Sequence, residues 1–280
     1  TEKELVASMV GREMKDYYNR QPHTRGEETL RVENLSGGKW FHNISFSAYK
    51  GEILGIAGLI GAGRTEVMET IFGAREREDG KVFVNGRETH FKSPKDAIAA
   101  RIGMVTEDRR RTGLMLEATV RENIVLPSLI YHHKQANFLD FKWEKDVAKE
   151  YVGKLGVKTP SVETLIANLS GGNQQKVILA KWLIAASDIL ILDEPTRGID
   201  VNAKSEFYAL MNEFVAQGGT VVMVSSELPE IIGISDRILV MREGQLTGEV
   251  PYREATEEKI IALASLHSDF EEEDTPDKVR

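Results

Sequence analysis

The stretch from Glu52 to Phe72 restricts the fold of this chain more than any other. An apolar segment, EILGIAG, runs directly into the glycine-rich sequence GLIGAGRT, and a helical pattern follows from Arg64 to Phe72. A strand, a glycine-rich loop and a helix in this order can wrap phosphate groups in backbone N–H groups. The loop fits the pattern G-x-x-x-x-G-K-[ST], except that Arg64 stands in the lysine position. Because short glycine-rich loops also occur as plain turns, this stretch needs support from other parts of the chain.

Segments that favour strands and helices alternate along the rest of the sequence. We expect strands at LRVENL, WFHNISFSAY, KVFVNG, RIGMVT, DILILD and TVVMVSS, and a terminal hairpin at RILVMREGQLTGEV. Ser93 and Pro94 start one helix, and KVILAKWLIAA and AKSEFYALMNEFVAQ have helical character. This alternation predicts an α/β fold with a mainly parallel sheet flanked by helices.

The sequence pattern also predicts how the chain is divided. Residues 117–168 have helical periodicity and no strong strand, which predicts a helical subdomain inserted between core parts at 29–116 and 169–266. We expect residues 1–28 to form a helix, from Glu2 to Tyr18, followed by a linker. The acidic, proline-containing tail at 267–280 is expected to be disordered.

The composition excludes several classes of protein. Cysteine is absent, so disulfides and cysteine-based zinc sites are impossible. The net charge of −8 and the lack of a long basic stripe argue against a nucleic-acid surface. No uninterrupted apolar run approaches the roughly 20 residues needed to cross a bilayer. We therefore expect any role at a membrane to depend on a partner.

A second motif, ILILDEPTRGID, places Asp193 and Glu194 at the end of an apolar strand. One carboxylate in this position can hold Mg²⁺, and a neighbouring one can orient an attacking water. An acidic pair at a strand end can instead cap the next helix. Its place in the same predicted sheet as the phosphate loop favours the chemical role. We expect Thr65 and Asp193 to hold Mg²⁺ and Glu194 to be the general base.

The third motif, LSGGNQQK at residues 169–176, opens the helix that leads to this strand. With all three motifs in this order, the chain resembles the ATP-binding-cassette (ABC) family of transporter ATPases over nearly all of residues 29–250. The resemblance implies a P-loop NTPase fold with N-terminal antiparallel strands, and ATP and Mg²⁺ as cofactors. It also implies a head-to-tail pair of ATPase domains with Asp200 at their contact. The signature residues that would then contact the partner's ATP are Ser170, Gly171, Gly172 and Asn173.

The same letters, LSGG, occur at residues 35–38 between two expected strands, where they predict a hairpin turn. A narrower resemblance rests on GLIGAGRTEV, MVTEDRRRTGL, LSGGNQQKVILAKWL and LDEPTRGIDV. These segments are similar to the second ATPase half in the duplicated ATP-binding subunit of bacterial monosaccharide importers. MVGREM resembles the join that follows the first half, although it could also belong to an N-terminal helix native to this domain.

This resemblance implies a set of partners and a location. The partners would be the first ATPase half, a transmembrane sugar permease and, indirectly, a sugar-binding protein, with no nucleic acid. The chain would lie peripherally at the cytoplasmic face of the membrane. Residues 117–168 and the loop of Glu107 would transmit movement to the permease.

Several positions depart from the family pattern. Arg64 replaces lysine with a larger, planar cation. Glu107 takes the position of a coupling glutamine, and its charge would repel a triphosphate unless Mg²⁺ or one of Arg109–Arg111 offsets it; that basic run could also be a solvated loop. Ser226 takes the position of a histidine that contacts the γ-phosphate. The aromatic residue that stacks on adenine is hard to place, and Trp40 and Phe41 are candidates unless they only pack in a strand.

These departures predict a slow nucleotide site next to a nearly intact signature. We expect this domain's loop to bind ATP and hydrolyse it slowly, while its signature completes the efficient site of the other half. The alternative is a regulatory module that binds nucleotide without hydrolysing it. A chromosome-repair ATPase is disfavoured because the insertion is short and the chain is acidic. The expected catalytic residues are Glu194, Ser226 and Glu107, and the expected nucleotide contacts of this domain's own site are Gly58, Gly61, Ala62, Gly63, Arg64, Thr65, Glu66 and Trp40.

Overall fold

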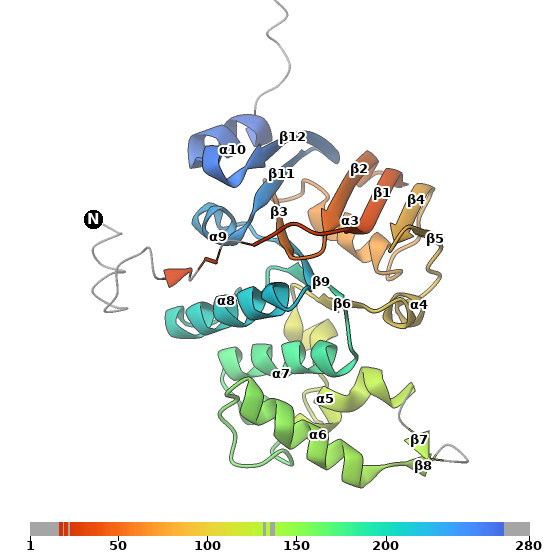
Figure 1. Cartoon of the computed structure of the whole chain (residues 1–280), viewed down its shortest axis with the longest axis vertical. Helices are drawn as coiled ribbons and strands as arrows, with labels where there is room; N and C mark the ends of the chain where they lie inside the picture. The colour runs from red at the N-terminus through yellow and green to blue at the C-terminus, as the bar shows by residue number, and fades with distance from the viewer. Residues whose placement is uncertain (1–16, 19, 22, 131–132, 135–137, 266–280) are drawn as a thin grey trace, which may run out of the picture.

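The structure is a computed structural model that describes residues 17–265, except 19, 22, 131–132 and 135–137. Two sheets form the upper part of the molecule in Figure 1, and a group of helices lies below them. The helix expected from Glu2 to Tyr18 lies outside the described residues apart from Tyr17 and Tyr18, and the expected tail at 267–280 lies wholly outside them.

The N-terminal sheet is antiparallel, with strand order β2-β1-β4-β5. LSGG at residues 35–38 ends β1 and enters the turn, where the Trp40 N–H donates to the Gly37 carbonyl at 3.1 Å. The predicted hairpin is present, but its turn covers residues 38–40, so only the last residue of LSGG lies in the turn. The strands are β1 (Glu28–Gly37), β2 (Phe41–Tyr49), β4 (Asp79–Val84) and β5 (Arg87–Thr89).

The main sheet has the order β12-β11-β3-β10-β9-β6, and only β12 pairs antiparallel within it. Every residue of β6, β9 and β10 is buried, as expected for parallel strands with both faces covered. The predicted mainly parallel sheet and terminal hairpin are therefore confirmed. The strands are β3 (Glu52–Gly58), β6 (Ile102–Val105), β9 (Ile189–Asp193), β10 (Thr220–Val224), β11 (Arg237–Arg242) and β12 (Gln245–Pro251).

The helices that start at Arg64 and Pro94 begin where the sequence predicted them, and the helix expected from Ala203 begins at Val201. The helices at Leu228–Ile234 and Glu257–Ser265 were not predicted. The side chain of Asp96 accepts hydrogen bonds from the Ser93 N–H and hydroxyl, so α4 starts with a capping box. The helix predicted from Arg64 ends at Ile71, one residue before the prediction. The helices are α3 (Arg64–Ile71), α4 (Pro94–Ala99), α8 (Val201–Ala216), α9 (Leu228–Ile234) and α10 (Glu257–Ser265).

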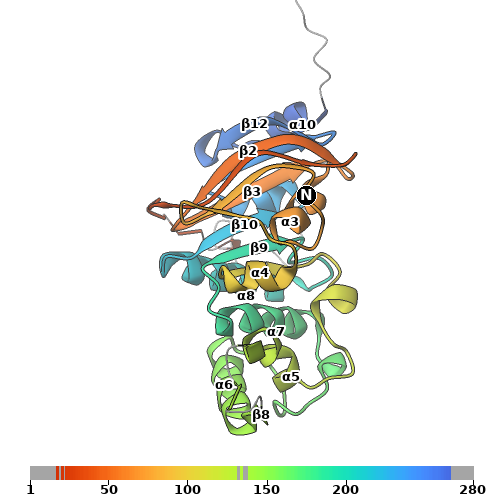
Figure 2. The ribbon, with the colours of Figure 1, turned by 90° about the vertical axis from the view of Figure 1, so that its right-hand side faces the viewer.

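The lower part of the molecule is mainly helical, as predicted for residues 117–168. One short strand pair, β7 (His133–Lys134) with β8 (Phe138–Leu139), was not expected. In both views α7 lies between α5 and α6 on one side and α8 on the other (Figures 1 and 2). The predicted boundary at residue 168 therefore falls at the start of a helix that contacts both parts. The helices are α5 (Val120–Val125), η2 (Leu126–Ile130), α6 (Phe141–Lys154), η4 (Ile166–Asn168) and α7 (Gly171–Ile184).

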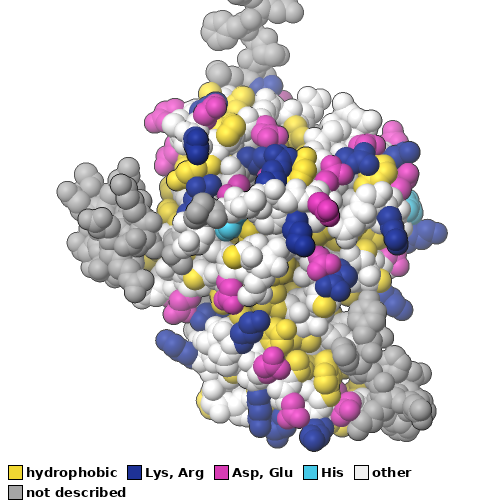
Figure 3. Space-filling model, viewed as in Figure 1, with side chains coloured by type: hydrophobic (Ala, Val, Ile, Leu, Met, Phe, Trp, Pro, Cys, Tyr) yellow, Lys and Arg dark blue, Asp and Glu magenta, His cyan; other side chains and the backbone are white. Residues whose placement is uncertain are grey.

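The surface carries charges of both signs. On the face shown in Figure 3, Lys and Arg side chains are interspersed with Asp and Glu, and apolar side chains also reach the surface. Within the described residues, none of the helices combines the length and the apolar character that a membrane span requires.

Candidate nucleotide site

The phosphate loop lies at the carboxyl end of β3 and leads directly into α3. Gly61 and Gly63 have φ angles of 84° and 89°, in the region that favours glycine. A Cβ on Gly63 would lie 2.5 Å from the Trp40 carbonyl oxygen, whereas a Cβ on Gly61 would meet no atom within 4 Å. The loop is thus closed by backbone at Gly63 and open at Gly61, which leaves room for phosphate oxygens. The other predicted loop residues, Gly58, Ala62 and Glu66, lie in the same strand–loop–helix unit.

Arg64 is turned into the protein and is only 8% exposed. Its Nη1 donates to the Ser225 carbonyl at 2.9 Å, and its Nη2 lies 3.9 Å from Glu194 Oε1. Burial lowers the pKa of the guanidinium, and the negative charges of Glu194 and Asp193 counteract this shift. A guanidinium remains charged in proteins. The arginine in the lysine position therefore forms a cationic bridge between the expected base and the end of β10.

Asp193 is 1% exposed, and neither of its carboxylate oxygens has a hydrogen-bond partner within the described part of the chain. Burial raises the pKa of this carboxyl to about 6, although the hydroxyl of Thr65 and the charge of Arg64 act in the opposite direction. Buried polar atoms normally have partners. A cation above Asp193 would supply one, so this carboxylate fits the expected Mg²⁺.

The surrounding donor set also fits Mg²⁺ bound together with ATP. Among the residues that the structure describes, no cluster of three or more His, Cys, Asp or Glu side chains could hold a metal on its own. Mg²⁺ at nucleotide sites typically takes one or two protein ligands and completes its shell with waters and phosphates. Asp193 and Thr65, beside the open loop, match that arrangement.

Glu194 lies between two of the residues that depart from the family pattern. The hydroxyl of Ser226 donates to Glu194 Oε2 at 3.2 Å, and Arg64 approaches Oε1 from the other side. Burial raises the pKa of Glu194, while Ser226 and Arg64 lower it. The backbone of Glu194 has a φ of 47°, which is uncommon for a residue other than glycine. The structure thus brings Arg64 and Ser226 together at the carboxylate of Glu194.

A buried carboxylate behind Glu194 was missed by the sequence analysis. Glu230 is 2% exposed and accepts hydrogen bonds from the Thr196 hydroxyl at 2.6 Å and the Tyr208 hydroxyl at 2.7 Å. It also accepts a hydrogen bond from the Ser225 hydroxyl. Burial is the largest cause of the raised pKa of Glu194, and Ser226 and Arg64 lower that pKa. The negative charge of Glu230 raises it further. The sequence ELPE at the start of α9 gives no signal for this role.

Glu107 pairs with Arg197, a residue that the sequence analysis did not consider as an offset for its charge. The reason is a tight turn: the Arg197 N–H donates to the Glu194 carbonyl at 3.1 Å, which brings Arg197 back over the Glu107 loop. Arg110 and Arg111 are exposed on a short π-helical turn, Arg109–Gly113. Arg109 is turned toward the signature helix instead, where its Nε donates to Gln174 Oε1 at 3.3 Å.

The signature residues lie at the start of α7, and Ser170 is exposed. The side-chain amide of Asn173 donates to the Ser170 hydroxyl at 2.9 Å and accepts from the Lys158 N–H at 2.7 Å. A Cβ on Gly172 would lie 2.5 Å from the Cβ of Ala203, so this glycine lets α7 approach α8 closely. The asparagine in place of glutamine therefore holds Ser170 toward the loop at Lys158.

The two candidates for adenine stacking differ in exposure. Phe41 is completely buried, so it packs in β2 and cannot stack on a base; that alternative is wrong. Trp40 is 42% exposed, and its ring lies 5.4 Å from the Arg75 guanidinium. The backbone carbonyl of Trp40 lies beside Gly63, so the exposed Trp40 ring is close to the phosphate loop.

Comparison with known proteins identifies the family. The family model described as ABC transporter matches residues 41–197, a range that holds the phosphate loop, the signature and the Asp193–Glu194 pair. This chain belongs to the ABC transporter family. The predicted resemblance is therefore confirmed.

The most similar proteins include several sugar-import ATP-binding proteins. The galactose/methyl galactoside import protein of Photobacterium profundum is 49% identical over 263 residues, covering 93% of this chain and 53% of that protein. The ribose import protein of Bacillus licheniformis is 48% identical over 262 residues, covering 94% of this chain and 53% of that protein. The xylose import protein of Thermoanaerobacter pseudethanolicus is 48% identical over 275 residues, with 95% and 54% covered. The ABC chain described here spans about half the length of the curated relatives it matches.

Solved structures confirm the ABC ATPase fold. An ATP-binding cassette of an ABC transporter in its ADP conformation matches with a TM-score of 0.71 at 21% identity, covering 85% of this chain and 98% of that one. A dimeric cassette in a post-hydrolysis state, bound to ADP and Pi, matches with a TM-score of 0.68 at 22% identity, covering 80% and 99%. At this identity the likeness shows the fold alone.

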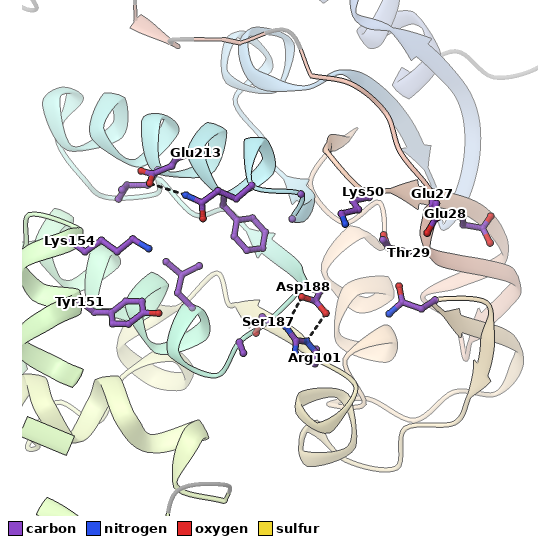
Figure 4. Close-up of a pocket in the computed structure, with 18 of the residues that line it drawn as sticks. Glu27, Glu28, Thr29, Lys50, Arg101, Tyr151, Lys154, Ser187, Asp188 and Glu213 are labelled. Atoms are coloured by element: carbon purple, nitrogen blue, oxygen red, sulfur yellow. Dashed lines mark hydrogen bonds and ion pairs between the residues drawn. The ribbon is translucent and has the colours of Figure 1, made fainter. Parts of the chain in front are cut away.

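This ABC domain has another cleft, of about 680 Å³, which contains none of the predicted site residues. Its lining includes Ser187 and Asp188, which precede β9, and Gly218 and Gly219, which precede β10, so it lies at the sheet edge opposite the phosphate loop (Figure 4). Arg101 and Asp188 in its wall form an ion pair at 2.5 Å, and Lys50 and Lys154 lie on facing sides. The nucleotide residues and this cleft are therefore at opposite edges of the sheet.

Proposed function

We propose that this chain is an ATP-binding and ATP-hydrolysing domain of a monosaccharide importer. One observation carries the proposal: the open phosphate loop, Glu194 with its contacts to Ser226 and Arg64, and a buried Asp193 lie at the same edge of the sheet, and among the described residues the carboxylate of Asp193 has no hydrogen-bond partner. Relatives named as importers of galactose, ribose and xylose support the sugar class without selecting one sugar.

The chain's own residues assign the roles in hydrolysis. Bound Mg²⁺, held by Thr65 and Asp193, would neutralise charge on the phosphates. The loop amides and the start of α3 would orient the triphosphate. Glu194 would take a proton from the attacking water, so the charge of Arg64 opposes catalysis by making this carboxylate a weaker base.

We propose that hydrolysis at this site is slow. The hydroxyl of Ser226 donates its hydrogen bond to Glu194, and a serine carries no charge that could stabilise the γ-phosphate. Losing a placed donor of that kind typically costs on the order of 10²–10³ in rate. Arg64 also lies against Glu194 and makes it a weaker base. The second candidate function is therefore a regulatory module that binds ATP without hydrolysing it.

We further propose that the exposed signature serves a second ATPase domain. Ser170 lies at the surface at the start of α7, where free N–H groups and the helix dipole favour an anion. A cassette of the same fold has been solved as a dimer, which supports a paired arrangement. The paired domain would be the first ATPase half, arranged head to tail, with Asp200 near the contact.

The proposed permease would contact the helical part at the cytoplasmic face of the membrane, and a sugar-binding protein would act through the permease. A cleft of about 610 Å³ there is lined by Met115, Leu126, Leu139 and Phe141. Met115, Leu126, Leu139 and Phe141 are all exposed, and an exposed group of large apolar side chains is typical of an interaction surface. Arg121 in its wall pairs with Glu144 and Glu163, which gives the cleft a fixed polar side.

The test is phosphate release from saturating MgATP by this chain, with bound nucleotide measured in the same sample. We expect bound ATP and slow release that Glu194→Gln abolishes. The matched control, Glu88→Gln, changes a half-exposed glutamate of the antiparallel sheet and should leave release unchanged. Bound ATP without release would favour the regulatory module, and absence of binding would refute both.

A further inference from the structure

Arg109 connects three segments that the sequence places far apart. Its Nη1 donates to the Arg197 carbonyl at 2.7 Å and its Nη2 to the Gly198 carbonyl at 3.2 Å. Its Nε donates to Gln174 Oε1 at 3.3 Å, in the first turns of α7. A guanidinium presents five N–H donors in a rigid fork, so one side chain can reach acceptors in different directions.

The acceptors of Arg109 are themselves fixed. The side-chain amide of Gln174 donates to the carbonyls of Ile166 and Leu169, both at 3.2 Å. The start of α7 is therefore tied to the segment before it and to Arg109 at once.

Gly171 provides the space that Arg109 occupies. A Cβ at Gly171 would lie 2.6 Å from Arg109 Nη2 and 3.1 Å from the Gly198 carbonyl oxygen. Any larger residue at this position would displace the guanidinium or the backbone beside it. The first signature glycine thus has an intramolecular role, separate from any contact with nucleotide.

A second connection joins two of the same segments. Glu107, two residues before Arg109, pairs with the side chain of Arg197. The loop of Glu107 therefore contacts the turn after Glu194 through the side chain of Arg197 and through two backbone carbonyls. The turn continues to Asp200, whose carboxylate caps α8 by accepting from the Ala203 N–H at 3.0 Å.

We propose that Arg109 is a positioning residue that holds the start of α7 and the segment 197–200 in one arrangement with the loop of Glu107. These contacts are intramolecular and do not depend on a partner. Their consequence rests on the proposed function: occupancy of this domain's own site would change the surface offered to the second ATPase domain. Arg109 would then couple the two nucleotide sites.

Hydrogen exchange of the full chain, with and without MgATP, tests the proposal. We expect Arg109→Ala to speed exchange of amides in 170–174 and 197–200 about tenfold, since it removes three hydrogen bonds. MgATP should change protection of these segments in the unmodified chain and not in Arg109→Ala or Arg109→Lys, because lysine keeps the charge and loses the fork. Arg110→Ala is the matched control, because its side chain is exposed on the same turn.

The outcomes separate this inference from the proposed function. MgATP protection around the phosphate loop shows nucleotide binding independently of Arg109. The proposed coupling would be wrong if MgATP protected the phosphate loop in all variants and also changed the exchange of 170–174 and 197–200 in Arg109→Ala as much as in the unmodified chain. Lack of any MgATP effect in the unmodified chain would instead refute the proposed function.

A double-mutant cycle tests the contact itself. Gly171→Ala should destabilise the chain to urea, because the added methyl group displaces Arg109. In the Arg109→Ala background the same change should cost clearly less, since alanine otherwise favours a helix over glycine. Equal effects of Gly171→Ala in the two backgrounds would contradict the proposed packing.

Discussion

Asp193→Asn is expected to stabilise this domain in the absence of nucleotide while abolishing its response to MgATP. The carboxyl is buried and has no hydrogen-bond partner in the described chain, and its pKa is raised from 3.8 to about 6. The folded state therefore holds the proton more tightly than the unfolded state. Stability from this group is complete below about pH 4 and declines as the pH rises toward 6.

The size of this effect follows from linkage. A shift from 3.8 to about 6 corresponds to about 3 kcal/mol of folding free energy that is lost between these pH values. Asparagine does not titrate, so the stability difference between Asp193→Asn and the unmodified chain should grow by about 3 kcal/mol from pH 4 to pH 7. An unsatisfied buried amide costs about 1–3 kcal/mol, so the net gain at pH 7 is smaller than this growth.

Urea unfolding at pH 4, 5.5 and 7, without nucleotide, measures this difference. Asp146→Asn is the control, because Asp146 is exposed on α6. At pH 7, MgATP should raise the unfolding midpoint of the unmodified chain, since a ligand that binds only the folded state stabilises it. It should not raise that of Asp193→Asn. If the difference in unfolding free energy between Asp193→Asn and the unmodified chain did not change with pH, the reasoning would be refuted, because ionisation of the buried Asp193 would then not destabilise the fold.

Three further predictions concern Glu194. Arg64→Lys should raise phosphate release about tenfold, because the shorter side chain withdraws from Glu194 Oε1 and fits the phosphate-loop pattern; unchanged release in a chain that still binds ATP would contradict this. Ser226→His should raise release by about 10² through a charged donor to the γ-phosphate, and a loss of release would show that the serine hydroxyl is itself required. Glu230→Gln removes a charge that raises the pKa of Glu194, so the acid limb of the pH–rate profile should move to lower pH; a move to higher pH would contradict the assignment.

The fold was predictable because its signals are local. The run ILILD has apolar residues on both faces, as a central parallel strand requires, and Ser93 with Asp96 encodes the start of α4 by itself. The strand pair β7–β8 gave no such signal, because its strands have two residues each. Short pairs depend on neighbouring packing more than on their own pattern.

The site was predictable where a motif fixes the backbone and unpredictable where a side chain crosses between segments. Asp193 is the last residue of β9 and Glu194 follows it directly, so the strand fixes the positions of both. The partner of Glu107 depends on how a turn 90 residues later folds back, and no spacing in the sequence expresses that contact. The same holds for Glu230, whose hydrogen bonds come from three different elements of the chain.

The two substitutions at this nucleotide site act on one group and so are not independent. Arg64 approaches one oxygen of Glu194 and Ser226 donates to the other, so both lower the pKa of the same carboxylate. Restoring lysine alone would leave the serine hydrogen bond to Glu194 in place, and restoring histidine alone would leave Arg64 beside the other oxygen of Glu194. Because Arg64 and Ser226 lower the pKa of the same carboxylate, the effects of the two restorations on phosphate release should not be additive. The slow site is therefore better described as one altered cluster around Glu194 than as a set of separate defects.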